Sequence, residues 1–235
     1  ISSNIVGFSN LLECCKIYEI KNLLYASSSS VYGGNTKTPF SETDSVNHQV
    51  SVYAATKKSN ELLAHTYSHL YKIPTIGMRF FTVYGPWGRP DMSPMLFAKS
   101  ILLKEPIKIF NYGEMSRSFT YIDDTVEIIL KLINKPAVKD NFFNTENPNP
   151  ATSWAPHRIF NLGNDKSVKL MDFISELEKE LQINAIKEFQ SIQPGDVKDT
   201  LSDCNLLENW IGSFKYTPIE IGIRNFVSWY KKYYD

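Results

Sequence analysis

Residues 53–85, "YAATKKSNELLAHTYSHLYKIPTIGMRFFTVYG", place an amphipathic helix directly before an apolar strand. Apolar side chains recur at helical spacing until Pro74, a residue that ends helices. The run from Pro74 to Gly85 is largely apolar, as in a strand buried on both faces of a sheet. Upstream, a helical pattern over 4–18 precedes a second short apolar run, "KNLLYAS" (21–27). Helix, strand, helix and strand with short connections predict an α/β fold with a parallel sheet and right-handed crossovers.

Beyond Gly85 the apolar run ends, and the stretch "GPWGRPDMSP", rich in Gly and Pro, predicts turns. A second long polar segment, 138–157, is rich in Asn and Pro and predicts a surface loop. Asp123 or Asp124 could cap the helix that follows them. By the same periodicity we expect helices over 95–105, 123–136, 169–181 and 219–234, and strands over 107–113 and 157–163.

Composition excludes several classes of protein. The 235 residues are 43% hydrophobic and 21% charged, which suits a globular protein with a core. Because 25 basic residues balance 25 acidic ones, we expect neither a nucleic-acid nor a membrane partner. No apolar run approaches the roughly 20 residues of a membrane helix, and no signal peptide opens the sequence. Three cysteines, Cys14, Cys15 and Cys204, form no disulfide framework, which favours the cytosol.

Tyr53 and Lys57 are four residues apart and therefore share one face of the predicted helix. An ammonium beside a phenol favours the phenolate and lowers the phenol pKa from about 10 toward neutrality. In an open parallel sheet, ligands bind at the carboxyl ends of the strands. The serine run 27–30, Tyr53 and the stretch 82–89 all fall at such ends, so together they predict a proton-handling site.

These stretches resemble a known family. "YASSSSVYG" (25–33) followed by "YAATK" (53–57) resembles the serine element and Tyr-x-x-x-Lys motif of the extended short-chain dehydrogenases/reductases. "RFFTVYGPWGRPDM" (79–92), "FNYGEMSRSFTYIDD" (110–124) and "QPGDV" (193–197) are similar to the NAD-dependent nucleotide-sugar epimerases and dehydratases, in particular to UDP-glucuronate 4-epimerases. A bare Tyr-x-x-x-Lys is a weak signal, but the serine element 25 residues upstream and the downstream stretches make the match specific.

The resemblance implies a role for individual residues. Tyr53 would be the catalytic base, Lys57 would lower its pKa and hold the nicotinamide ribose, and Ser28 would hydrogen-bond the reacting hydroxyl. NAD would be the cofactor, in contact with Asn4, Ser27, Tyr53, Lys57, Phe80 and the backbone of Phe81. A UDP-sugar would contact Ser29, Ser30, Thr82, Arg89, Asn111, Tyr112, Arg117, Gln193 and Asp196. Within that set, Arg117 would bind the diphosphate, Asn111 or Tyr112 would lie near uracil, Asp196 near the ribose, and Thr82 and Arg89 beside the sugar.

The implied reaction is 4-epimerisation of UDP-glucuronate to UDP-galacturonate through a 4-keto sugar. The implied fold is part of a Rossmann-type doubly wound parallel sheet over 1–85. A smaller, mixed α/β substrate-binding domain covers most of 86–235, with segments returning to the first part. The family forms homodimers through the helices that correspond to 4–18 and 53–71, so we expect a homodimer.

The sequence departs from the family in two places. Ser118 stands where the family usually has Asp, and the glycine-rich loop that holds the cofactor pyrophosphate is absent from these residues. The chain opens at Ile1 inside a helical pattern with no strand before it, so we expect the family's first four strands to be missing.

Two alternatives stay open. The first is a UDP-glucose 4-epimerase or a sugar-nucleotide dehydratase, for which a change at Arg89 would leave turnover intact. The second is a non-catalytic chain that only binds a UDP-sugar or dimerises, which the missing glycine loop favours. His65 and His69 have a metal-like spacing, but no third ligand joins them; we predict no metal site and place both on an exposed or subunit face.

Overall fold

A computed structural model describes residues 1–193 and 197–234. The chain folds as two compact units, each built from three separate segments. Unit 1 comprises residues 1–81, 127–162 and 202–214, and unit 2 comprises residues 82–126, 163–201 and 215–235. Helix α4 (Ile122–Ile133) begins in unit 2 and ends in unit 1.

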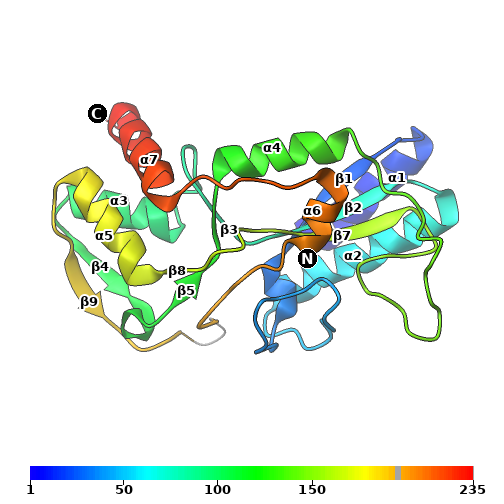
Figure 1. Cartoon of the computed structure of the whole chain (residues 1–235), viewed down its shortest axis with the longest axis horizontal. Coiled ribbons are helices and arrows are strands. Elements are labelled where there is room, and N and C mark those ends of the chain that lie inside the picture. The colour runs from blue at the N-terminus through cyan, green and yellow to red at the C-terminus, as the bar shows by residue number, and fades with distance from the viewer. Residues whose placement is uncertain (194–196, 235) are drawn as a thin grey trace. The chain divides into compact units, whose positions relative to one another are not determined.

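The sheet of unit 1 has three parallel strands, β1 (Leu23–Ser28), β2 (Thr75–Phe80) and β7 (His157–Leu162), in the order β1-β2-β7 (Figure 1). Ser28 pairs with Phe80, and Phe80 with Leu162, so the carboxyl ends of the three strands are level. This arrangement confirms the predicted α/β class with a parallel sheet. In the described part of the chain β1 pairs only with β2 and is therefore an edge strand.

Two long helices accompany this sheet. A π-helical turn, η1 (Ser2–Gly7), leads into α1 (Phe8–Ile17), and α2 spans Val52–Tyr71. Ser51 caps α2 by accepting a hydrogen bond from the Ala54 N–H at 3.1 Å. The apolar faces of both helices pack on β1 in one cluster that includes Leu12, Cys15, Leu23, Tyr25 and Ala64. This packing determines which face of α2 is turned toward the sheet. A short helix, α6 (Asn205–Ile211), packs against β7.

Unit 2 gathers helices around three short strand pairs. The helices are α3 (Ser93–Leu102), α5 (Leu170–Leu181) and α7 (Ile219–Tyr234). The parallel pairs are β3 (Thr82–Tyr84) with β6 (Phe119–Tyr121) and β4 (Pro106–Ile109) with β9 (Ile186–Phe189); β5 (Ser116–Arg117) with β8 (Val168–Lys169) is antiparallel. One aromatic-rich core, with Tyr84, Phe119 and Phe173 in mutual ring contact, joins these elements.

The structure differs from the sequence-based expectation at several boundaries. The apolar run 74–85 is two strands, because the chain leaves the first sheet at Phe81. The strand expected over 107–113 stops at Ile109 and continues as a 3-10 turn, η3 (Phe110–Gly113). Asp124 does not cap α4 but accepts hydrogen bonds from the backbone N–H and hydroxyl of Thr217, at 2.8 and 2.7 Å. The sequence did not predict the short elements β5, β6, β8, β9 and α6. Each is too short for a repeating pattern of apolar residues to indicate a helix or a strand.

Among the described residues, every helix is too short or too polar to cross a bilayer.

Candidate active site

The serine run forms a tight turn at the carboxyl end of β1. Ser28 is 8% exposed, and its hydroxyl oxygen accepts a hydrogen bond from the Ser30 N–H at 3.2 Å, which begins the 3-10 turn η2 (Ser29–Tyr32). A hydroxyl that accepts in this way keeps its own proton to donate. Gly33 ends the turn with φ at +54°, where a Cβ would collide with the His48 carbonyl oxygen. Glycine is therefore required here, and the turn presents Ser29 and Ser30 at the surface.

Tyr53 and Lys57 lie one turn apart on α2, as the spacing predicts. The Lys57 Nζ donates a hydrogen bond to the Ala26 carbonyl of β1 at 3.0 Å and lies 5.9 Å from the centroid of the Tyr53 ring. Burial lowers the pKa of the Lys57 ammonium. The Tyr53 side chain is half exposed, so its phenol is accessible to a ligand. Lys57 thus ties the first two turns of α2 to the strand that ends in Ser28.

A hollow lies along the edge of β1. It is lined by Leu24, Tyr25 and Ala26 of the strand, by Lys57 and Asn60 of α2, and by Asn4 of η1. The Asn4 side-chain amide donates to the Thr56 hydroxyl at 3.0 Å, which fixes its direction. The structure therefore brings Asn4 and Lys57, two of the predicted cofactor contacts, to one concave surface.

Two other predicted cofactor contacts are already engaged within the protein. The Ser27 hydroxyl, 2% exposed, donates to the Glu61 carboxylate at 2.7 Å. The Phe81 N–H donates to the Leu162 carbonyl at 3.0 Å. A ligand that contacts the Phe81 backbone must therefore use its carbonyl oxygen. The Phe80 side chain is half-buried.

Unit 2 contains a separate cavity. Its polar lining includes Thr82, Lys108 and Arg117, and its apolar lining includes Phe110 and Phe119. The Arg117 guanidinium is oriented by hydrogen bonds from one nitrogen to the Ser116 and Lys198 carbonyls, at 2.9 and 2.8 Å. Lys108 also lines the cavity and was not predicted as a site residue. The local sequence "PIKI", in which exposed and buried residues alternate, indicates a strand with Lys108 on its exposed face but does not indicate a cavity.

The remaining predicted substrate contacts that the structure describes lie at the surface of unit 2. Arg89 forms a forked ion pair with Asp91, at 2.6 and 3.0 Å, and both side chains are largely exposed. Asn111 donates to the Glu114 carbonyl at 2.6 Å, and Tyr112 is 65% exposed. Gln193 is exposed, and Asp196 lies outside the described residues.

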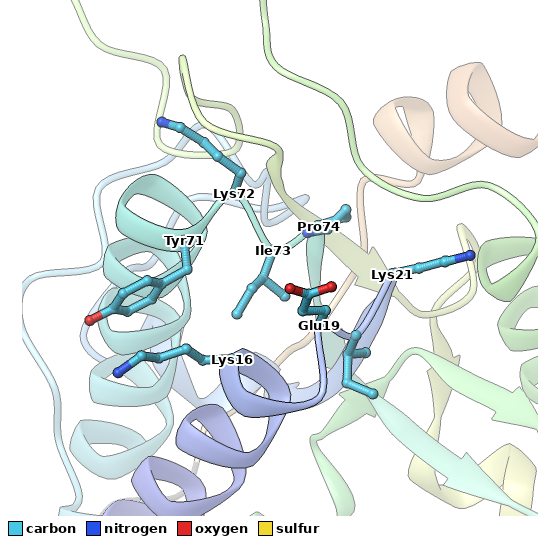
Figure 2. Close-up of a pocket in the computed structure, with 8 residues that line it drawn as sticks. Lys16, Glu19, Lys21, Tyr71, Lys72, Ile73 and Pro74 are labelled. Atoms are coloured by element: carbon cyan, nitrogen blue, oxygen red, sulfur yellow. The ribbon is translucent and has the colours of Figure 1, made fainter.

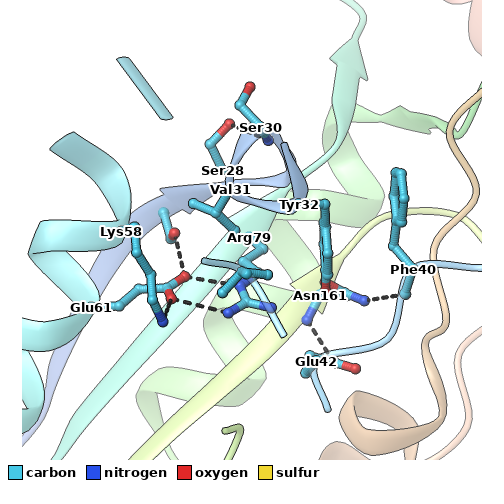
Figure 3. Close-up of polar contacts among 12 residues, drawn as sticks. Ser28, Ser30, Val31, Tyr32, Phe40, Glu42, Lys58, Glu61, Arg79 and Asn161 are labelled. Atoms are coloured by element: carbon cyan, nitrogen blue, oxygen red, sulfur yellow. Dashed lines mark hydrogen bonds and ion pairs between the residues drawn. The ribbon is translucent and has the colours of Figure 1, made fainter. Parts of the chain in front are cut away.

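A buried polar network supports the serine turn and was not predicted (Figure 3). The Glu61 carboxylate accepts two hydrogen bonds from Arg79 of β2, at 2.9 and 3.0 Å. The Arg79 guanidinium lies 4.9 Å from the centroid of the Tyr32 ring, and the Tyr32 hydroxyl donates to the Asn161 side chain at 2.6 Å. A signal was present in the sequence, because a lone arginine inside the apolar run "TIGMRFF" requires a buried partner.

The opposite end of the β1–β2 pair has a different character. Figure 2 shows a second hollow there, where Lys16, Glu19, Lys21 and Lys72 surround the apolar Ile73. None of the predicted site residues lines it. Of the two helix histidines, which were expected on an exposed or subunit face, His69 is exposed and His65 is half-buried, and both contact the 138–157 loop. His65 hydrogen-bonds to Ser153 at 2.7 Å, and the Trp154 indole donates to His69 at 2.9 Å. Among the described residues, no three metal-ligating side chains converge.

Known proteins share this arrangement over the whole chain. Residues 1–145 match the NAD dependent epimerase/dehydratase family. The chain belongs to this family. Protein CapI of Staphylococcus aureus is 51% identical over 234 residues, which are 100% of this chain and 70% of that protein. A probable UDP-glucuronate 4-epimerase of Rhizobium meliloti (strain 1021) is 45% identical over 235 residues, 100% of this chain and 69% of that protein.

A solved structure gives the same result for this member of the epimerase/dehydratase family. The UDP-glucuronic acid 4-epimerase from Bacillus cereus, in complex with UDP-glucuronic acid and NAD, matches with a TM-score of 0.86 at 30% identity. The match covers 100% of this chain and 69% of that one.

The family is NAD-dependent, and the donors in unit 1 fit one end of that cofactor. A lysine ammonium has three N–H donors, and Ala26 accepts one from Lys57, so the others can reach ribose hydroxyls in the hollow beside β1. The pyrophosphate end requires a glycine-rich loop, which this sequence lacks. The residues present therefore offer donors for ribose hydroxyls of NAD but no glycine-rich loop for its pyrophosphate.

Proposed function

We propose that this chain carries the acid–base and sugar-binding residues of a UDP-sugar 4-epimerase that converts UDP-glucuronate to UDP-galacturonate. The observation that carries the proposal is the Tyr53–Lys57 pair, with Tyr53 half exposed and Lys57 bonded to the strand that ends in Ser28. The three-stranded sheet would belong to a Rossmann-type doubly wound sheet, and unit 2 would be the substrate-binding domain. Exposed apolar residues of α1 and α2, among them Leu11 and Leu62, support a homodimer through these helices.

Each residue would do one task. The Tyr53 oxygen would take the proton from the sugar C4 hydroxyl and later return it, while the Ser28 hydroxyl hydrogen-bonds the same oxygen of the sugar. The Lys57 ammonium would stabilise the phenolate by its charge. Bound NAD would accept hydride from C4 and return it, so that net redox change is nil. General acid–base help of this kind is worth roughly 10²- to 10⁴-fold.

The cavity of unit 2 supports the choice of a nucleotide sugar. Arg117 and Lys108 provide two cations for a diphosphate, and a guanidinium forks onto phosphate oxygens. The neighbouring Phe110 and Phe119 provide aromatic surface for a base. Asn111, Tyr112, Gln193 and Asp196 stay predicted contacts of the nucleotide.

Glucuronate places a special demand on the protein. Its 4-keto intermediate is a β-keto acid, which loses carbon dioxide fastest when the carboxylate bond stands perpendicular to the carbonyl plane. Thr82 and Arg89 are the proposed contacts that keep the carboxylate out of that geometry, and Ser29 and Ser30 stay predicted contacts of the substrate. The forked Arg89–Asp91 pair supports this assignment, because it shows that the Arg89 guanidinium can engage a carboxylate through two hydrogen bonds.

The test is direct. The natural protein that contains this chain is incubated with UDP-glucuronate and NAD, and UDP-galacturonate is sought by chromatography. Formation of UDP-galacturonate without net NADH is the expected result. Turnover of UDP-glucose alone would replace the proposal by the UDP-glucose epimerase alternative.

A further inference from the structure

One face of α2 connects to β1 through two successive residues of the strand. Tyr53, Lys57 and Glu61 follow each other at four-residue intervals and so share a face of the helix. Lys57 bonds to the carbonyl of Ala26, and Glu61 accepts the hydroxyl proton of Ser27 at 2.7 Å. The next residue of the strand is Ser28. The helix that carries the proposed base is thus tied to the strand immediately before the proposed catalytic hydroxyl.

The Glu61 carboxylate is itself held rigidly. It is 3% exposed and accepts hydrogen bonds from three side chains: Ser27, Arg79 and Lys58, the last at 3.2 Å. Burial alone raises the pKa of the Glu61 carboxyl, but the Arg79 charge and its hydrogen bonds outweigh burial and hold that pKa below its ordinary value. Glu61 therefore stays an anion, and charge-assisted hydrogen bonds are the strong ones.

The same network holds the other end of the serine turn. Tyr32, 1% exposed, ends η2 and stacks on Phe40 with ring centroids 4.6 Å apart. Arg79 lies beside the Tyr32 ring, and Asn161 of β7 accepts its hydroxyl proton. Figure 3 shows Ser28 and Ser30 at this turn, with Glu61 on one side of Arg79 and Tyr32 on the other. Strands β2 and β7, and helix α2, therefore all contribute to fixing η2 and Ser28 before it.

We infer that Glu61 is a positioning residue for catalysis: through Ser27 it sets the place of the Ser28 hydroxyl relative to Tyr53 and Lys57. The inference rests on the proposed function, because it assigns to Ser28 and Tyr53 the roles given there. The role assigned to Glu61 requires no contact with substrate or cofactor. Its effect is transmitted by one hydrogen bond, and a catalytic group displaced by about 1 Å can lose roughly 100-fold in rate.

The test removes that hydrogen bond and keeps the ion pair. Ser27→Ala deletes the hydroxyl, while Glu61 still binds Arg79 and Lys58. Ser68→Ala is the matched control, because Ser68 is also fully buried, lies on α2, and its hydroxyl has no hydrogen-bond partner among the described residues. Ser27→Thr keeps a hydroxyl and serves as the rescue variant. The full natural protein is assayed for kcat and KM with UDP-glucuronate.

We expect kcat to fall at least tenfold in Ser27→Ala, with KM for the UDP-sugar changed less than threefold, and to recover in Ser27→Thr. Ser68→Ala should keep the kcat of the wild type. A purely structural role of Ser27 would reduce the yield of folded protein and leave kcat per folded molecule unchanged. Equal kcat values in Ser27→Ala and Ser68→Ala would overturn the inference.

A second measurement needs no activity. Hydrogen exchange of the 235-residue chain, followed by mass spectrometry, should be faster over residues 28–34 in Ser27→Ala than in Ser68→Ala. If the wild type turns over no UDP-sugar, the proposed function fails and the exchange rates alone decide whether Ser27 orders the turn. Equal exchange rates over residues 28–34 in the two variants would show that the Ser27–Glu61 hydrogen bond does not order the turn, whatever the enzymatic activity.

Discussion

Glu61 of α2 and Arg79 of β2 form a buried, forked ion pair, with two N–O distances of 2.9 and 3.0 Å and with neither side chain more than 3% exposed. Two charges are expensive to bury, so the pair persists because each compensates the other. The hydrogen bond from Ser27 gives the carboxylate a further donor. The pair therefore joins α2, the helix that carries Tyr53, to β2, the strand that pairs with β1 and its last residue Ser28.

Breaking this pair should destabilise the protein strongly. Glu61→Gln leaves the Arg79 guanidinium buried without a counter-charge, and we expect a loss of about 3–5 kcal/mol in the free energy of unfolding, measured with denaturant. The double variant Glu61→Leu/Arg79→Met removes both charges and should be more stable than either single variant. A loss below about 1 kcal/mol in Glu61→Gln would show that the pair contributes little.

Tyr53→Phe tests the proposed base. The substitution removes only the phenol oxygen and keeps the ring, so folding should be preserved while kcat falls by several orders of magnitude. Tyr71→Phe, at the far end of the same helix, is the control and should keep full activity. A decrease of less than tenfold, which corresponds to about 1.4 kcal/mol of barrier, would mean that Tyr53 is not the base.

Glu42 should make stability fall as the pH rises. Burial, with a smaller contribution from the nearby Asp203 charge, raises the pKa of this carboxyl from 4.5 to about 7, although the hydrogen bond that Glu42 accepts from the Asn161 N–H at 2.7 Å acts in the opposite direction. The folded state therefore binds the proton more tightly than the unfolded state. The contribution of protonated Glu42 to the free energy of unfolding is fully present below pH 4.5. It is lost as the pH rises to about 7, which lowers the free energy of unfolding by up to about 3 kcal/mol.

Glu42→Gln is the corresponding variant. It keeps an oxygen to accept the Asn161 N–H and cannot ionise. Its free energy of unfolding, relative to the wild type, should increase between pH 4.5 and 7.5 in urea titrations. Parallel stability curves for the two proteins over this range would contradict the assignment.

Asp91 and a glucuronate carboxylate should compete for Arg89. The ion pair is exposed and therefore contributes little free energy, so a ligand carboxylate can readily replace Asp91. We expect Asp91→Asn to lower KM for UDP-glucuronate by up to about fivefold, and to leave KM for UDP-glucose, which has no carboxylate, unchanged. An equal effect on both nucleotide sugars would argue that Arg89 does not contact the carboxylate.

The 235-residue chain alone should bind UDP weakly, bind NAD poorly and catalyse little or nothing. The cavity with Arg117 lies within these residues, whereas the glycine loop for the cofactor pyrophosphate does not. Calorimetric titration measures both ligands. Arg117→Ala should weaken UDP binding, and Arg224→Ala, which removes an exposed arginine of α7, should not. Micromolar NAD binding with steady epimerisation by this chain would refute the prediction.

Local patterns in the sequence determined the architecture of unit 1. Helical periodicity located α1 and α2, and unbroken apolar runs located β1 and β2, because both patterns depend only on neighbouring residues. The spacing of Tyr53 and Lys57 placed them on one face of α2 for the same reason. Short strands such as β5 and β8 span two residues each and left no pattern to detect.

Tertiary structure decided which of the candidate groups are available to a ligand. Ser27 and Ser28 are indistinguishable in the run "SSSS", but Glu61, 34 residues later, engages only the first. The Phe81 N–H is taken by Leu162, and Arg89 is bound to Asp91. Sequence periodicity specifies the direction of a side chain relative to its own helix or strand. Its partner depends on which elements become neighbours and in which register, and burial then makes that partner obligatory for every polar group enclosed.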